Sequence, residues 1–285
     1  MSDLETGFNT LLEGPSGVGK TYAIGTLVDA GMETFVVFLE SGAESLYAYW
    51  TDRGLPIPDN LHVHVLKTQK ASFKELAESA KRSNSLPYDT LAKMVDPERA
   101  KYNAFINLLG VMGKFVDQRT GEDFGAVDEW GMDRVIVIDG LTGVNRAAMQ
   151  LVIGGRPARS QNDWGHAQHY VEEFLRTCCD GCRCNFVMIA HVEKELDSLN
   201  GGMKITMSTL GKALAPKIPQ MFSDVILARR DGNTFSWSTA DAGADLKNRN
   251  LPISDKLKPD FGAIIKKWRS RMAGIMESSD ENDQA

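Results

Sequence analysis

Residues 8–39, FNTLLEGPSGVGKTYAIGTLVDAGMETFVVFL, contain the stretch that decides the fold. A short apolar run at 8–12 predicts a strand, and the glycine-rich segment after it leads into a helix that ends near Gly31. The run 34–39 has no polar alternation, which predicts a second strand buried on both faces. Strand, glycine loop, helix and strand form a βαβ unit, which requires a right-handed crossover and a parallel sheet.

The segment between the first strand and the helix is a complete P-loop, with the pattern Gly-x-x-x-x-Gly-Lys-Thr. Its glycines permit backbone angles that turn the amides inward around phosphates, and the start of the helix adds its dipole. Lys20 is expected to reach the β- and γ-phosphates, and the Thr21 hydroxyl to bind Mg²⁺. ATP and Mg²⁺ are therefore the expected cofactors, bound by Gly14, Pro15, Ser16, Gly17, Val18, Gly19, Lys20 and Thr21.

Three polar residues stand at the ends of apolar strands, where ligands gather in open α/β sheets. Asp139 ends the strand 134–139 and fits a Walker B carboxylate that holds Mg²⁺ through water, or else a cap of the next turn. Glu40 follows the second strand and could orient or deprotonate the attacking water, or be a solvated loop residue. His191 ends the strand 185–190 and could sense the γ-phosphate or be a satisfied edge histidine.

Composition limits the remaining classes of protein. The chain has 285 residues, 42% hydrophobic and 25% charged, and its 32 Lys and Arg against 38 Asp and Glu give a net charge of −6. These proportions exclude a wholly disordered, collagen-like or coiled-coil chain. There is no run of ~18 apolar residues for a membrane span, no apolar leader, and no cysteine spacing typical of a disulfide framework. We therefore expect a reduced, cytoplasmic location without membrane contact, and the mild acidity leaves room for a local basic groove.

The remaining periodicity predicts an α/β chain with a mainly parallel central sheet flanked by helices. Further strands are expected at 61–66, 223–228 and 234–238, amphipathic helices at 71–84 and 97–117 (the second started by Asp96 and Pro97), and a helix at 164–179. Loop or mobile segments are expected at 118–130 and 193–216. As domains we predict one ATPase domain over 1–272, with an insertion at about 53–130, and an acidic disordered tail at 273–285.

Two further patterns have open interpretations. Four cysteines lie within seven residues and could ligate zinc, but they close a helix and open a buried strand, which favours structural thiols. The segment 266–271 mixes cations with Trp268, and could stack on and neutralise single-stranded DNA or form a solvated helix face. The cysteines are Cys178, Cys179, Cys182 and Cys184.

Together, the P-loop, Glu40, Asp139 and His191 resemble the RecA-like ATPase core. The resemblance implies that Glu40 activates the attacking water. It also implies that His191, where RecA proper has glutamine, couples the γ-phosphate to a mobile DNA-binding loop at 193–212, and that a first DNA loop lies at 150–163. The basic residues in these two loops are Arg156, Arg159, Lys194, Lys204 and Lys212.

Lys247 and Arg249 follow a late strand and look like the Lys-x-Arg element with which RecA-like rings and filaments reach the γ-phosphate of a neighbouring subunit. The layout of residues 8–268 is similar to phage-encoded RecA-like ATPases of the nucleotide-binding or single-strand annealing type. The resemblance implies a DNA-stimulated ATPase that anneals or exchanges single strands in phage recombination, in the host cytoplasm. It further implies a homo-oligomeric ring or filament, with a single-strand binding protein as an additional partner. No oligomerisation domain precedes the first strand, which leaves the subunit interface open.

Other P-loop classes fit less well. The alternative is a RecA-like helicase or translocase, which a stable ring and DNA-stimulated unwinding would identify. A small-molecule kinase is disfavoured by the long Walker spacing and the lack of an Arg-rich lid, and an ABC protein by the lack of Leu-Ser-Gly-Gly-Gln. An AAA+ protein is disfavoured because too little chain follows Arg249 for a helical lid domain. A nucleotide switch stays open if Glu40 is not the base.

Overall fold

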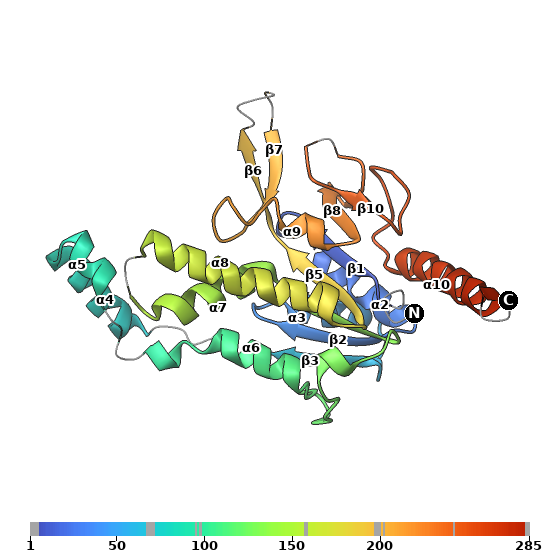
Figure 1. Cartoon of the computed structure of the whole chain (residues 1–285), viewed down its shortest axis with the longest axis horizontal. Helices are drawn as coiled ribbons and strands as arrows, with labels where there is room; N and C mark the ends of the chain where they lie inside the picture. Colours follow the sequence, from blue (N-terminus) through green and yellow to red (C-terminus); the bar gives the residue numbers. More distant parts are fainter. Residues whose placement is uncertain are drawn as a thin grey trace.

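The computed structural model has a central sheet with helices on both faces (Figure 1), which confirms the predicted α/β fold with a mainly parallel sheet. No helix in the described part of the chain is both long and apolar enough to cross a membrane. The structure describes residues 6–66, 72–94, 96, 99–156, 159–196, 201, 203–241 and 243–282, and for 275–282 only the backbone.

Within those residues the central sheet has eight strands, in the order β10-β8-β1-β5-β4-β2-β3, with β9 also paired to β8. The strands from β8 to β3 pair in parallel, whereas β9 and β10 run antiparallel to β8. The strands are β1 (Asn9–Glu13), β2 (Glu33–Phe38), β3 (Leu61–Val65), β4 (Arg134–Asp139), β5 (Asn185–Ala190), β8 (Asp224–Asp231), β9 (Thr234–Ser238) and β10 (Lys247–Asn248).

Both faces of the sheet are buried, which explains the uninterrupted apolar runs. Successive side chains of a strand point to opposite faces, so Phe35 and Ile136 pack on one side while Val36 and Val137 pack on the other. The first face is covered by α6 (Ala104–Gly113), α7 (Leu141–Ile153) and α8 (Gln161–Arg176), and the second by α1 (Lys20–Ala23), α2 (Gly25–Asp29), α3 (Ala43–Thr51) and α10 (Gly262–Asn282).

The segment 53–130 is not wholly an insertion, because two of its elements belong to the core. Strand β3 pairs with β2 along its whole length, and α6 buries Phe105 and Leu108 in the main hydrophobic cluster. The peripheral part is an arm made of α4 (Phe73–Ser85) and α5 (Tyr88–Lys93), which projects from the body in Figure 1.

The predicted helix over 97–117 is wrong in its first half. The chain makes a 3₁₀ turn at Arg99–Lys101, and the α-helix begins only at Ala104, with Asn103 before it. Asp96 does not cap a helix, because its carboxylate accepts a hydrogen bond from the backbone N–H of Gly155 at 2.5 Å. Residues 97 and 98 lie outside the described residues.

Two segments that were expected to be irregular contain regular structure. In 193–216 the chain forms a hairpin of β6 (Val192–Leu196) and β7 (Met203–Met207), whose backbone pairing replaces the expected mobile loop. Helix α10 continues to Asn282, so most of the tail predicted as disordered is helical, and 283–285 lie outside the described residues.

Asn185 joins three strands at the amino end of the sheet. Its buried side chain accepts a hydrogen bond from Phe8 N at 3.0 Å and donates to the carbonyls of Met132 and Arg134 at 2.8 and 2.9 Å. We predict that Asn185→Ala lowers the free energy of unfolding by about 3 kcal/mol, because buried polar groups lose their partners. Urea unfolding would measure this, with the exposed Asn107→Ala as the matched control. Equal stability of the two variants would contradict the prediction.

Candidate active site

The P-loop wraps the end of β1 in the way its glycines predict. Gly14 has φ 156°, and a Cβ at this position would lie 2.6 Å from the carbonyl oxygen of Ala228 on β8. Gly19 has φ 79° and stands immediately before α1, so only glycine suits both points. The loop therefore fits closely between β1, β8 and the helix that follows.

Lys20 is buried, and its ammonium donates to the carbonyl oxygens of Gly14 and Pro15 at 2.7 and 2.6 Å. Burial lowers the pKa of Lys20 to about 8, although the nearby charge of Asp139 acts in the opposite direction. The ammonium thus stands inside the loop where a phosphate chain would supply the missing counter-charge.

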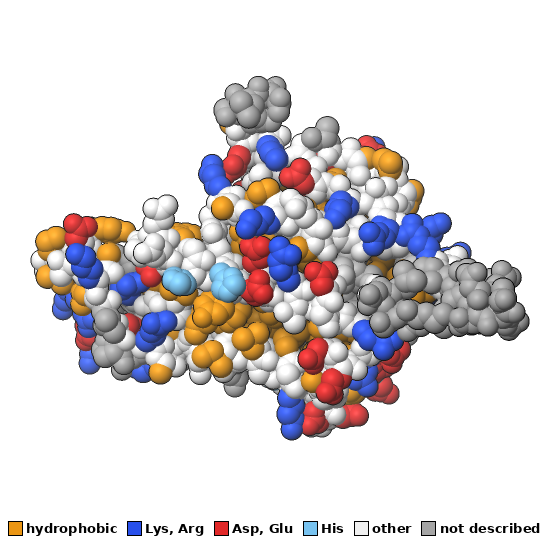
Figure 2. Space-filling model, in the orientation of Figure 1, with side chains coloured by type: hydrophobic (Ala, Val, Ile, Leu, Met, Phe, Trp, Pro, Cys, Tyr) orange, Lys and Arg blue, Asp and Glu red, His pale blue; other side chains and the backbone are white. Residues whose placement is uncertain are grey.

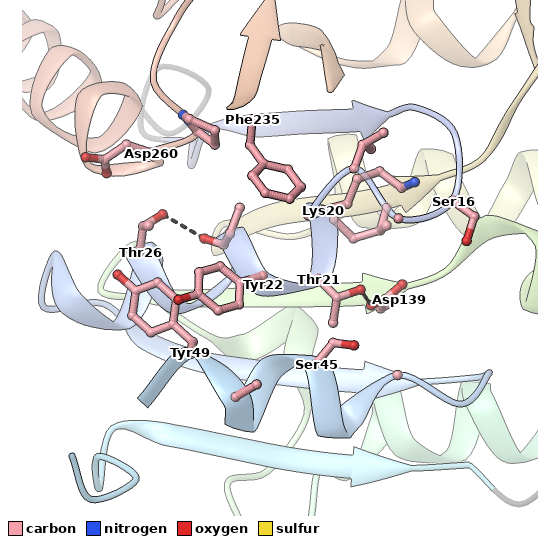
Figure 3. A pocket seen from close by; sticks show the side chains of 18 of the residues that line it. Ser16, Lys20, Thr21, Tyr22, Thr26, Ser45, Tyr49, Asp139, Phe235 and Asp260 are labelled. Carbon is pink, nitrogen blue, oxygen red and sulfur yellow. Dashed lines mark hydrogen bonds between the residues drawn. The ribbon is translucent and has the colours of Figure 1, made fainter. Parts of the chain in front are cut away.

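Thr21 and Asp139 meet at the mouth of the loop (Figure 3). The Thr21 hydroxyl donates a hydrogen bond to Asp139 Oδ2 at 2.6 Å. Burial raises the pKa of Asp139, and the Thr21 hydrogen bond and the Lys20 charge oppose that shift. A hydroxyl and a carboxylate side by side are oxygen donors of the kind that Mg²⁺ prefers, so these two residues fit the expected ion.

Glu40 and His191 line the same cavity as Lys20 and Asp139, as expected for residues that follow neighbouring strands. The Glu40 side chain is 29% exposed and lies 3.8 Å from the Arg146 guanidinium on α7. Burial lowers the pKa of His191, and the Lys20 charge lowers it further, which favours the neutral imidazole. The cavity therefore brings together the His191 imidazole, the carboxyl groups of Glu40 and Asp139, and the Lys20 ammonium.

The cavity has a volume of about 1050 Å³ and extends well beyond the P-loop. The Phe235 ring from β9 projects into it beside the P-loop helix, and Tyr22, Tyr49 and Asp260 line its far side (Figure 3). Sequence reasoning missed Phe235, Tyr49 and Asp260, because they come from a β-strand, a helix and a loop without a motif. Only the fold brings them to the nucleotide-sized space.

The two cations of the Lys-x-Arg pattern have different environments. The Lys247 ammonium donates to the carbonyl oxygens of Pro219, Gln220 and Phe222 at 3.2, 3.1 and 2.6 Å. It therefore holds the end of α9 (Ile218–Met221) of its own chain, which argues against a role in a neighbouring subunit. Arg249 is exposed, next to the strand β10 that pairs with the start of β8.

The first proposed DNA loop offers one free cation rather than two. Arg156 is largely buried, where it pairs with Asp163 at 2.6 Å and donates to the carbonyl of Ala92 at 2.8 Å. These contacts make Arg156 a structural residue. Arg159 is exposed, with its guanidinium 5.6 Å from the centre of the Trp164 ring.

The second proposed DNA loop is the β6–β7 hairpin with the segment after it. Lys194 is exposed, while Lys204 and Lys212 form solvent-exposed ion pairs with Asp245 and Glu195 at 3.5 and 3.4 Å. Such pairs contribute little to stability, so a polyanion can displace the carboxylates.

The base of this hairpin closes on the P-loop strand. Ser208 N donates to the carbonyl of His191 at 2.9 Å, and Lys204 and Asp245 line a cavity with the buried Glu13, the last residue of β1. Burial, followed by the charge of Asp245, raises the pKa of Glu13 to about 8. The hairpin is thus joined to the nucleotide cavity through His191, which lines that cavity and directly precedes β6.

Trp268 and the four cysteines, whose interpretation the sequence left open, pack in the hydrophobic core. Trp268 is buried, packs edge-on against Phe8 with ring centres 5.7 Å apart, and donates to the carbonyl of Thr6, so it is not a free platform for DNA bases. All four cysteines are free, buried thiols in the core cluster. Among the described residues, no group of three or more His, Cys, Asp or Glu side chains is arranged to hold a metal ion.

Comparison with a protein-family model supports the same core. A family model described as an AAA domain matches residues 6–251. The crystal structure of the RadB recombinase is similar over 81% of this chain and 80% of that chain, with 14% identity and a TM-score of 0.33. No curated protein matches the chain. The sequence analysis disfavoured an AAA+ protein because the chain after Arg249 is short, and the match to an AAA domain model contradicts that expectation. The match ends at residue 251, and after it the described residues contain a single α-helix, α10, so it concerns the ATPase core.

The low pKa of Lys20 gives a testable pH dependence. Above pH 8 the free protein loses the Lys20 proton, whereas the phosphates of bound ATP retain it. We predict that ATP binding above pH 8 takes up one proton and weakens up to about tenfold per pH unit, but shows no such change from this group at lower pH. Titration calorimetry in buffers of different ionisation enthalpy would measure the uptake. Lys20→Arg stays charged and should take up no proton; equal uptake by both proteins would contradict the assignment.

Proposed function

The chain belongs to the AAA domain family and has a RecA-like P-loop ATPase fold, and on this premise we propose that it hydrolyses ATP while acting on single-stranded DNA. The proposed reaction is annealing or strand exchange in phage recombination, in the host cytoplasm. The observation that carries the proposal is the convergence of Lys20, Thr21, Asp139, Glu40 and His191 on one cavity, at the foot of the β6–β7 hairpin.

The nucleotide phosphates take the place of the loop carbonyls around Lys20. Backbone N–H groups of the P-loop and the start of α1 face the phosphates, and the Lys20 ammonium balances their charge. Thr21 and Asp139 would hold Mg²⁺, which supplies neutralisation of the phosphate charge when bound. The cavity beyond the P-loop, with Phe235 and Tyr22 on its walls, receives the nucleoside.

We assign the role of general base in ATP hydrolysis to Glu40. Its carboxylate is partly exposed to the cavity and can accept a proton from the attacking water. Arg146 and Glu40 form an ion pair that orients this carboxylate. His191 lies near Lys20, where an imidazole N–H can donate to a γ-phosphate oxygen. Strand β6 begins at the next residue, so binding of the γ-phosphate can change the position of the hairpin.

DNA contacts are assigned to the hairpin and to Arg159. Lys194, Lys204 and Lys212 point their charges to solvent, which suits the sequence-independent neutralisation of a single strand. A homo-oligomer places Arg249 of one copy at the γ-phosphate of the next, where a cation in trans stabilises the charge of the transferred group. A single-strand binding protein is a further proposed partner.

The proposed base is tested by Glu40→Gln, which keeps the size of the side chain but cannot accept a proton. We predict that single-stranded DNA raises the ATPase rate of the wild type, and that Glu40→Gln binds ATP normally but turns over ~10²–10⁴-fold more slowly. The exposed Glu44→Gln is the matched control and should match the wild type. Unchanged turnover in Glu40→Gln would remove Glu40 from the mechanism.

The proposed DNA surface is tested by neutralising four of its cations. We predict that the combined change of Arg159, Lys194, Lys204 and Lys212 to Ala weakens binding of any single strand. The slope of log K against log salt should fall by about 3, since each phosphate contact on a single strand contributes roughly 0.7. Fluorescence anisotropy at several salt concentrations measures both quantities. The control changes Lys256, Lys266 and Lys267 to Ala; a loss confined to that control would place the strand beside α10 instead.

A further inference from the structure

Helix α4 has an apolar face that the described residues of its own chain leave largely exposed. Phe73, Leu76, Ala77 and Ala80 recur at the spacing of one helix face, and none of the α4 residues is buried. Phe73 is 92% exposed and Leu76 is 52% exposed. A contiguous exposed apolar face of this kind marks a contact surface. We call these four residues the α4 stripe.

Most of the α4 stripe lies away from the body of its own subunit. The other side of the helix faces the body, because Glu75 pairs with Lys101 at 3.8 Å, and Ser79 and Arg82 line a cavity shared with α7. Leu76, at the edge of the stripe, also lines that cavity. The neighbouring α5 is attached through the Tyr88 hydroxyl, which donates to the carbonyl of Arg159 at 2.6 Å. These contacts hold the arm, which projects from the body in Figure 1.

A second exposed apolar surface lies between α6 and α8. A groove with a volume of about 340 Å³ has Phe105 and Phe174 in its floor and Leu109, Met112 and Tyr170 along its walls. Leu109 is 47% exposed and Tyr170 is 42% exposed. Figure 2 shows hydrophobic side chains gathered over these two helices. We call this surface the α6–α8 groove.

The charges beside the two surfaces are complementary. Lys74 and Lys81 are seven residues apart, so they flank the α4 stripe on the same side of the helix. Asp128 and Glu173 are exposed on the rim of the α6–α8 groove. An apolar helix with cations on one flank matches an apolar groove with carboxylates on its rim, as in helix-in-groove recognition.

We propose that the α4 stripe of one copy docks in the α6–α8 groove of a second copy of this chain. The two surfaces are different patches, so the contact is heterologous and repeats into a ring or a filament. The inference rests on the assembly in the proposed function and gives that assembly an interface. One helix in a groove buries less than the ~1,200–2,000 Å² of a standard interface, so assembly should depend on protein concentration.

Sedimentation velocity of the full chain at rising concentration tests the contact. Wild type and the control Ile253→Asp, whose side chain is 76% exposed elsewhere, should both assemble. Phe73→Asp and Leu109→Asp should each remain monomeric, but an equimolar mixture should form a heterodimer, because it contains one intact stripe and one intact groove. Assembly of either variant alone, or a mixture that stays monomeric, would overturn the proposal.

A charge-reversal pair guards against variants that fail to fold, because both residues are exposed. Lys81→Glu should weaken assembly, and adding Glu173→Lys in the same chain should restore it; no restoration contradicts the docking geometry. A wild type that stays monomeric but binds phosphatidylserine vesicles through Phe73 would assign the stripe to a lipid surface and overturn the proposal.

Failure of this interface is distinguishable from failure of the proposed function. The interface is judged by sedimentation, and the function by ATP turnover in mixtures of Lys20→Ala with Arg249→Ala, where one subunit contact regains both an intact loop and an intact Arg249. Assembly through the stripe without ATP turnover leaves the interface standing and removes the function. ATP turnover by a proven monomer would remove both this interface and the trans role of Arg249, but it would leave the P-loop and Glu40 as the site of hydrolysis.

Discussion

Parallel pairing of β1, β5, β4 and β2 is the constraint on which the site depends. The register aligns Glu13 with Ala190, Ile189 with Asp139, and Asp139 with Phe38, so the carboxyl ends of all four strands stop at one edge. These strand ends bring the P-loop, Glu40, Asp139 and His191 to the same cavity. A one-residue shift of any of these strands would exchange the side chains that pack on the two faces of the sheet, and would separate the P-loop from its partners.

Within that edge, burial sets the chemistry. It lowers the pKa of Lys20 and raises the pKa of Asp139, and each charge partly compensates the other. The Thr21 hydroxyl and the loop carbonyls satisfy the remaining polar atoms. In the proposed function, phosphate and Mg²⁺ would replace these partners, because Lys20 now donates to the loop carbonyls and Thr21 donates to Asp139.

The β6–β7 hairpin, the α4–α5 arm and the α6–α8 groove are the outer surfaces through which DNA and a second copy would act on the site in the proposed function. The β6–β7 hairpin begins directly after His191, and its Lys204 lines a cavity with Glu13 of β1. In the proposed function, single-stranded DNA bound to the hairpin would therefore lie close to residues of the nucleotide cavity. The arm and the α6–α8 groove lie on other elements and can join copies without occupying the hairpin. In the proposed function, Glu40, the β6–β7 hairpin and Arg249 would respond together to nucleotide, DNA and assembly.

The sequence by itself determined the parts that depend on local order. The P-loop is a continuous motif, and Asp139 and Glu40 follow apolar strands whose parallel pairing was predictable, so the fold class and these positions followed. Only the tertiary structure decided which cations are free: Lys247 is held by carbonyls of α9, and Arg156 pairs with Asp163. A side chain's partners come from distant segments, and neither periodicity nor spacing encodes whether a charge reaches solvent or its own chain.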